Sequence, residues 1–92
     1  MRHPDVPIIT FTGSRETGVA VTKAAAENLK HVHLELGGKN AIIVMDDADL
    51  DLAVDGIVWS AFGTSGQRCT AASRVIVHKA VYGELQTKLV AA

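Results

Sequence analysis

The only cysteine of the chain, Cys69, lies in the segment TSGQRCTA, among glycine and small polar residues. A free cysteine is more often buried, where it behaves as a small apolar side chain. A thiol becomes a nucleophile when a nearby cation, a helix N-terminus or backbone N–H groups lower its pKa. Gly66 and Arg68 offer an open loop and an adjacent positive charge. Cys69 is therefore a candidate nucleophile, with an inert surface thiol or a small packed residue as the alternative.

A second candidate is Glu35, which lies between Leu34 and Leu36 in the segment HLELGGKN. Strand alternation places the two leucines on one face and the carboxylate on the other. A carboxylate whose pKa is raised by burial can act as a general base. The Gly37-Gly38 pair lets another group come close to the backbone. The alternative is a solvent-facing glutamate before a turn.

The segment FTGSRETG places glycine between an expected strand and an expected helix. The free N–H groups of a first helical turn can bind an anion, and Ser14 is a suitable N-cap. Gly13 and Gly18 have the spacing of a phosphate-binding loop, but Val19-Ala20 replaces the required lysine and hydroxyl residue, and the pattern GxGxxG also fails. A plain strand-to-helix turn is the alternative.

Two further patterns do not favour a metal site. His31 and His33 share a strand face, but no third ligand follows at a recognisable spacing. The acidic run MDDADLDLAVD lacks the glycine and glutamate of a calcium loop. It indicates instead the start of a helix, with Asp47 or Asp49 as N-cap.

The composition is that of a globular protein: 48% of the 92 residues are hydrophobic and 21% are charged. A net charge of −1 offers no basic surface for nucleic acid or an anionic membrane. Apolar runs are too short for a transmembrane helix, and the first residues lack the apolar core of a signal peptide. Because one cysteine cannot form an internal disulfide, a reducing, cytoplasmic location is expected.

The elements that position these residues alternate between strand and helix. Apolar and β-branched runs predict strands over 6–13, 31–36, 40–45 and 73–78. Helical spacing predicts helices over 14–30, 46–63 and 79–92. The order β-α-β-β-α-loop-β-α indicates an α/β protein with mostly parallel strands.

The expected helices present apolar stripes for packing. The stripe of the first helix consists of Val21, Ala24, Ala25 and Leu29. The stripe of the second consists of Leu50, Ala53, Val54, Ile57, Ala61 and Phe62. Strands as apolar as AIIVM normally need cover on both faces, which three helices can hardly supply. We therefore expect an interior piece of a larger protein, with exposed apolar strand faces and aggregation of the isolated chain.

Taken together, FTGS (11–14), LELGGKN (34–40) and GQRC (66–69) resemble the NAD(P)-dependent aldehyde dehydrogenase superfamily in order and spacing. The separation of Glu35 from Cys69 is the one expected between the family's glutamate and cysteine motifs. The resemblance covers essentially all 92 residues, but only a middle slice of the family's longer chain.

The resemblance implies that Cys69 is the catalytic nucleophile and Glu35 the general base. Attack of the thiolate on an aldehyde would give a thiohemiacetal, and hydride loss would leave a thioester that Glu35-activated water hydrolyses. The backbone N–H of Cys69 and, in the family, an upstream asparagine would hold the oxyanion.

The resemblance further implies a cofactor, NAD or NADP. Gly13 and Ser14 match the turn and helix start that meet the cofactor's pyrophosphate. Leu36 and Gly37 match positions whose backbone lies near the nicotinamide. No metal is implied. The substrate would be a small-molecule aldehyde, and the full-length protein would be a homo-oligomer.

In the family, residues 1–36 correspond to the C-terminal part of a Rossmann-like coenzyme-binding domain. Residues 37–92 correspond to the N-terminal part of an α/β catalytic domain, so the four strands would not form one sheet. Three alternatives remain: a truncated, catalytically inert chain, a coenzyme A-dependent acylating semialdehyde dehydrogenase, and a redox-responsive thiol protein. We expect the 92 residues alone to be inactive.

Overall fold

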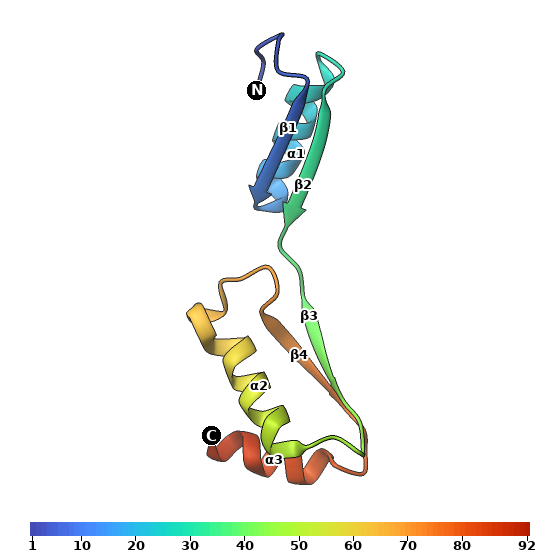
Figure 1. Cartoon of the computed structure of the whole chain (residues 1–92), viewed down its shortest axis with the longest axis vertical. Helices are drawn as coiled ribbons and strands as arrows, with labels where there is room; N and C mark the ends of the chain where they lie inside the picture. The colour runs from blue at the N-terminus through green and yellow to red at the C-terminus, as the bar shows by residue number, and fades with distance from the viewer. The chain divides into compact units, whose positions relative to one another are not determined.

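A computed structural model describes the whole chain, residues 1–92, which divides into two compact units, Met1–Gly37 and Gly38–Ala92 (Figure 1). The elements follow the order predicted from the sequence. The four strands form two separate two-stranded sheets, and both strand pairs are parallel. The predicted α/β class with parallel strands is confirmed, as is the expectation that the strands do not share one sheet.

The first unit contains β1 (Ile8–Gly13), α1 (Arg15–Ala26) and β2 (His31–Leu36). The two strands pair in register from Ile8 with His31 to Gly13 with Leu36, and α1 lies along one face of the pair (Figure 1). Val21 and Ala25 of α1 are buried. The predicted cap is confirmed, because the Ser14 hydroxyl accepts a hydrogen bond from the backbone N–H of Thr17 at 3.1 Å.

The end of α1 differs from the prediction of a helix through residue 30. Leu29, expected to pack, is 91% exposed and has a left-handed φ of 51°. The N–H of Lys30 bonds the carbonyl of Ala25, and the N–H of Leu29 bonds that of Ala26. These bonds form a Schellman turn, in which the left-handed residue is usually glycine. The helix therefore stops before Leu29, whose side chain is turned away from the core.

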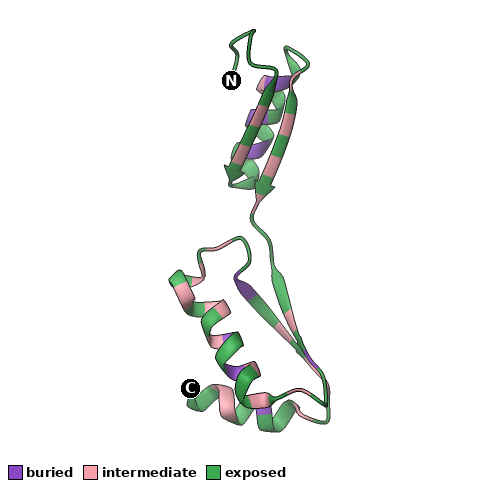
Figure 2. Ribbon diagram, in the orientation of Figure 1, coloured by how far each residue is buried: buried purple, intermediate pink, exposed green.

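The second unit contains β3 (Asn40–Val44), α2 (Leu50–Phe62), the short 3₁₀ helix η1 (Gly63–Gly66), β4 (Ala72–Val77) and α3 (Tyr82–Ala91). Its core consists of buried apolar side chains from β3, α2 and α3: Val44, Val54, Ile57 and Leu85 (Figure 2). Lys88 of α3 donates to the Asp51 carboxylate of α2 at 2.5 Å, and this hydrogen bond raises the pKa of Lys88. Side chains of α2 and α3 thus make both apolar and polar contacts.

The boundaries of α2 refine the prediction of a helix over 46–63. Asp49 is the N-cap, because its carboxylate accepts from the backbone N–H groups of Asp51 and Leu52, each at 3.1 Å. The preceding Asp47 lies in a turn. Phe62, expected in the apolar stripe, is 73% exposed, because it ends α2 beyond the buried core residues Val54 and Ile57.

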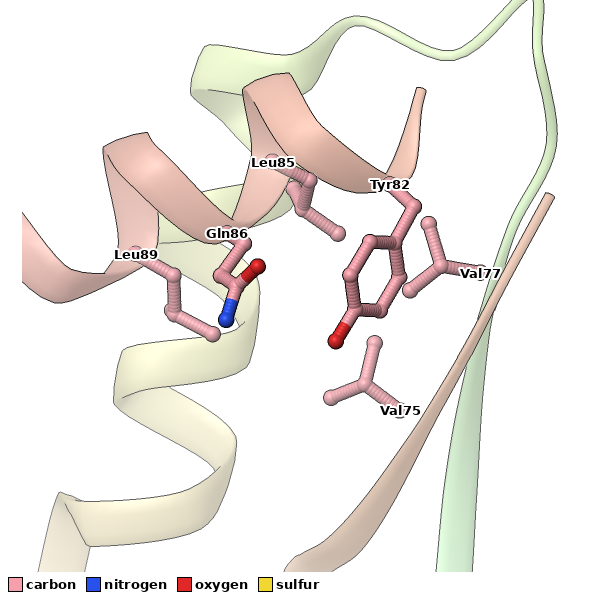
Figure 3. A pocket seen from close by; sticks show the side chains of 6 residues that line it. All are labelled: Val75, Val77, Tyr82, Leu85, Gln86 and Leu89. Carbon is pink, nitrogen blue, oxygen red and sulfur yellow. The ribbon is translucent and has the colours of Figure 1, made fainter. Parts of the chain in front are cut away.

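Each sheet exposes apolar side chains, as the sequence led us to expect. Ile43 of β3 and Ile76 of β4 are register partners and are 67% and 54% exposed. A hollow of about 160 Å³ between β4 and α3 is also largely apolar (Figure 3). Its lining residues are Val75, Val77, Tyr82, Leu85, Gln86 and Leu89. None of the helices is long and apolar enough to cross a membrane.

Candidate functional site

Most of the predicted site residues lie at one edge of the first unit. Gly13 and Leu36 are register partners at the carboxyl ends of β1 and β2, and Glu35 pairs with Thr12 one position earlier. Ser14 follows β1 directly and caps α1. In open α/β sheets, ligands bind outside the carboxyl ends of the strands. The topology thus places Gly13, Ser14, Glu35 and Leu36 at the edge where a ligand is expected.

Two glycines allow the close packing of this edge. A Cβ at Gly13 would lie 2.6 Å from the ring of Phe11, a separation that real Cβ atoms do not tolerate. A Cβ at the buried Gly18 would lie 3.0 Å from the Leu36 side chain, so Gly18 lets α1 approach β2. By contrast, Gly37 is exposed, and no atom lies within 4 Å of its hypothetical Cβ. Its backbone is therefore open to a flat group.

Glu35 is exposed in the first unit, whereas Leu34 and Leu36 are half-buried, as strand alternation predicted. Its register partner Thr12 is exposed on the same pair of strands. Residues 1–37 thus leave the Glu35 carboxylate exposed. Cys69 belongs to the second unit, and it is a free, exposed thiol.

Cys69 follows a segment of unusual backbone conformation. Thr64, Ser65 and Gly66 have φ values of 54°, 56° and 67°, three left-handed residues in succession. This region favours glycine, and a β-branched residue such as Thr64 is strained there. Strained backbone is concentrated at functional sites, where the surrounding structure holds it in place. The conformation therefore supports the interpretation of this loop as a functional one.

The Gly66→Ala substitution is expected to destabilise the second unit. A Cβ at Gly66 would lie 2.8 Å from the carbonyl oxygen of Ala61, and the left-handed φ adds about 1–2 kcal/mol of strain. Urea unfolding of a complete enzyme that carries residues 1–92 measures the loss as a lower midpoint. The control is Gly56→Ala within α2, where a Cβ meets nothing and alanine is favoured by up to about 1 kcal/mol. Equal midpoints for the two variants would contradict this strain.

Arg68 connects the loop to the end of α2. Its guanidinium carbon lies 3.9 Å from the centroid of the Trp59 ring, and its Nη2 donates to the Trp59 carbonyl at 3.1 Å. The positive charge next to Cys69 in the sequence therefore makes a cation–π contact with the Trp59 ring and a hydrogen bond to a backbone carbonyl of α2. Trp59 is 66% exposed and packs on Arg68 instead of in the core.

Asn40 makes a contact that the sequence did not reveal. Its side-chain Nδ2 donates to the carbonyl of Cys69 at 2.6 Å and to the carbonyl of Ala71 at 3.1 Å. Asn40 ends the motif LELGGKN, but no local pattern indicates a partner so far along the chain. Only the pairing of β3 with β4 brings these residues together.

The structure places no group of three or more histidine, cysteine, aspartate or glutamate side chains where they could hold a metal ion. His31 and His33, which the sequence singled out as a weak zinc pattern, are both exposed on β2. A zinc site needs three or four protein ligands.

Comparison with known proteins gives the class of protein. The chain matches the model of the aldehyde dehydrogenase family over residues 1–92. It is 50% identical over 95 residues to 1-pyrroline-5-carboxylate dehydrogenase 1 of Halalkalibacterium halodurans, covering 97% of this chain and 18% of that protein. It is 46% identical over 97 residues to 1-pyrroline-5-carboxylate dehydrogenase of Bacillus subtilis, covering 99% of this chain and 19% of that protein.

Comparison with solved structures leads to the same family. The betaine aldehyde dehydrogenase of Staphylococcus aureus in complex with NAD+ is similar with a TM-score of 0.91 and 40% identity, over 97% of this chain and 18% of that chain. An aldehyde dehydrogenase of Brucella melitensis is similar with a TM-score of 0.90 and 43% identity, over 97% of this chain and 18% of that chain. The chain belongs to the aldehyde dehydrogenase family, as its motifs indicated, and spans about a fifth of the length of these relatives.

Proposed function

We propose that this chain is part of an enzyme that oxidises an aldehyde to a carboxylic acid with NAD+ or NADP+. The observation that carries the proposal is the match of all 92 residues to the aldehyde dehydrogenase family. Within that match, the two residue types that the chemistry needs, a thiol and a carboxylate, occur in the segments GQRC and LELGG.

Cys69 is the proposed nucleophile. Its thiolate attacks the aldehyde carbon, forming a carbon–sulfur bond and an oxyanion, which the backbone N–H of Cys69 stabilises. The exposure of the thiol supports this role, because an aldehyde must reach the sulfur. Loss of hydride from the resulting thiohemiacetal leaves a thioester on Cys69. Sulfur suits both stages, since a thiolate is a strong nucleophile and later a good leaving group.

Glu35 is the proposed general base for release of the product. It takes a proton from a water molecule, which attacks the thioester carbon and displaces the Cys69 thiolate. The product is a carboxylic acid. The exposed carboxylate at the end of β2 supports this role, because it is accessible to water.

The carboxyl edge of the first unit fits a dinucleotide cofactor. We propose that Gly13 and Ser14, at the start of α1, bind its pyrophosphate, because the first turn of a helix carries free N–H groups. Leu36 and Gly37 would lie against the nicotinamide, and the open space at Gly37 admits a flat ring. When bound, the cofactor supplies the acceptor for the hydride. The Staphylococcus aureus relative is in complex with NAD+, which supports this choice of cofactor class.

We also propose which domains of the complete enzyme these residues belong to. Residues 1–36 would belong to the coenzyme-binding domain and residues 37–92 to the catalytic domain. The division of the chain after Gly37 supports this boundary. The complete enzyme would be a homo-oligomer in the cytoplasm, where a reactive thiol stays reduced.

A reconstructed enzyme tests the proposed function. Residues 1–92 replace the matching segment of the Bacillus subtilis relative, and NADH formation is followed with 1-pyrroline-5-carboxylate, which opens in water to an aldehyde. We expect NADH production that depends on this substrate and needs no coenzyme A. The unmodified relative is the control. A reconstructed enzyme that melts cooperatively like the relative, yet forms no NADH, would refute the proposal.

A further inference from the structure

We propose that Asn40 is a positioning residue for Cys69, an inference that rests on the proposed function of Cys69 as nucleophile. The side-chain amide of Asn40 has two hydrogens, and the carbonyls of Cys69 and Ala71 are its two acceptors, at 2.6 Å and 3.1 Å. Because both partners only accept, the NH₂ group must face them, which fixes the orientation of the amide. One side chain thus holds the backbone of the nucleophile itself and of the residue two positions later.

The end of the strand ladder explains why a side chain is needed here. Asn40 pairs with Ala72, but Ala41 already pairs with Arg74, so the register is irregular between the first two residues of β3. Before Ala72 the loop has no strand partner. The Asn40 amide continues the ladder by donating to the carbonyls of Cys69 and Ala71.

Neighbouring hydrogen bonds hold Asn40 in place. Arg74 of β4 donates from its Nη2 to the carbonyl of Lys39 at 2.7 Å. Ser73 donates from its hydroxyl to the carbonyl of Asn40 at 3.4 Å. The start of β3 is therefore tied to β4 on both sides of the Asn40 peptide, and the amide extends from a fixed backbone.

The other side-chain contacts of the loop involve the neighbours of Cys69 and not its carbonyl. Arg68 is held on Trp59 of α2, and the N–H of Ala72 donates to the hydroxyl of Ser60 at 3.1 Å. These contacts hold the residues before and after Cys69, but Asn40 is the donor to the Cys69 carbonyl itself. The N–H of Ala71 donates to the Arg68 carbonyl at 3.0 Å and closes a turn around Cys69 and Thr70. The central peptide of such a turn can flip while this bond is kept, so the orientation of the Cys69 carbonyl depends on the Asn40 amide.

Rotation of this peptide would affect catalysis directly. The carbonyl orientation sets the ψ angle of Cys69, and with it the direction of the thiol relative to the chain that follows. The backbone N–H of Cys69, which the proposed mechanism uses for the oxyanion, belongs to the same residue. Misplacement of reacting groups by about 1 Å can cost about 10²-fold in rate. Asn40 therefore acts through Cys69, without touching the substrate.

The test compares two variants of Asn40 in the reconstructed enzyme. Asn40→Leu keeps the approximate shape and removes both donors, and Asn40→Asp keeps the size and polarity. We expect both to lower kcat by about 10- to 100-fold with little change in KM. Asn40→Gln, which retains the NH₂ group, recovers part of the loss. The matched controls are Asn28→Leu and Asn28→Asp, at an exposed asparagine that follows α1 in the first unit.

A second readout separates positioning from general stability. Hydrogen exchange of the Ala71 amide, which donates to the Arg68 carbonyl at 3.0 Å across the turn that contains Cys69, is expected to accelerate in both Asn40 variants, while the buried Val44 keeps its protection. Unchanged kcat in either Asn40 variant relative to its Asn28 control would overturn the inference, as would equal acceleration at Ala71 and Val44. Failure of both variants to fold would also overturn it. An inactive but folded unsubstituted enzyme refutes the proposed function instead.

Discussion

The Cys69→Ser variant of the reconstructed enzyme is expected to lose aldehyde oxidation, with kcat lowered by at least about 10³-fold. Serine keeps the shape of the side chain, but its hydroxyl stays protonated near neutral pH, whereas a thiol forms a nucleophilic thiolate. The neighbouring Arg68 cannot activate a hydroxyl, because its guanidinium stays protonated and only donates, here to the Trp59 carbonyl. Stopped-flow measurement of NADH shows the loss in the first turnover.

The control for this variant is Thr70→Ser, a similarly small change at the exposed neighbour of Cys69. It is expected to leave kcat within about twofold, because the change removes one methyl group from an exposed side chain and keeps the hydroxyl. Both variants should bind NAD+ equally, since the proposed cofactor contacts lie in residues 1–37. A Cys69→Ser enzyme with kcat within tenfold of the unsubstituted enzyme would exclude Cys69 as the nucleophile.

The local elements of the fold could be predicted because their signals are local. A β-branched run ended by Gly13, and an alanine-rich segment capped by Ser14, each specify their structure within a few residues. Asp49 was one of two cap candidates, and the backbone hydrogen bonds of the first turn select it. Where the signal was absent, the prediction was wrong: Leu29 occupies a left-handed turn position that sequence patterns assign to glycine.

The candidate site could be predicted only in part. Residue types made Glu35 and Cys69 candidates with inert alternatives, and the resemblance of three spaced motifs to the aldehyde dehydrogenase family favoured their reactive roles. The partners of these groups depend on tertiary structure. The bond from Asn40 to Cys69 needs the register of β3 with β4, and the position of the Arg68 guanidinium needs the end of α2. Neither of these two contacts can be predicted from the residues adjacent to Asn40 or Arg68 in the sequence.

The Glu35→Gln variant is expected to separate the two halves of the proposed reaction. Glutamine keeps the shape of the side chain but cannot take a proton from water, so hydrolysis of the thioester should slow by about 10²- to 10⁴-fold. Formation of the thioester does not use Glu35, and hydride transfer should proceed. Rapid mixing should therefore show a burst of NADH of about one equivalent per active site, followed by slow turnover.

Two comparisons make this result specific to Glu35. Glu84→Gln, at an exposed glutamate of α3, should turn over without a change in steady-state rate. Hydroxylamine, which attacks a thioester without a general base, should raise the steady-state rate of the Glu35→Gln enzyme. Loss of the burst itself would place Glu35 before hydride transfer and contradict its role in release. If coenzyme A, rather than water, is the acceptor, the unsubstituted enzyme should itself stop after the burst until coenzyme A is added. Because the burst reports on Cys69 and the later phase on Glu35, a single trace tests the roles of both residues.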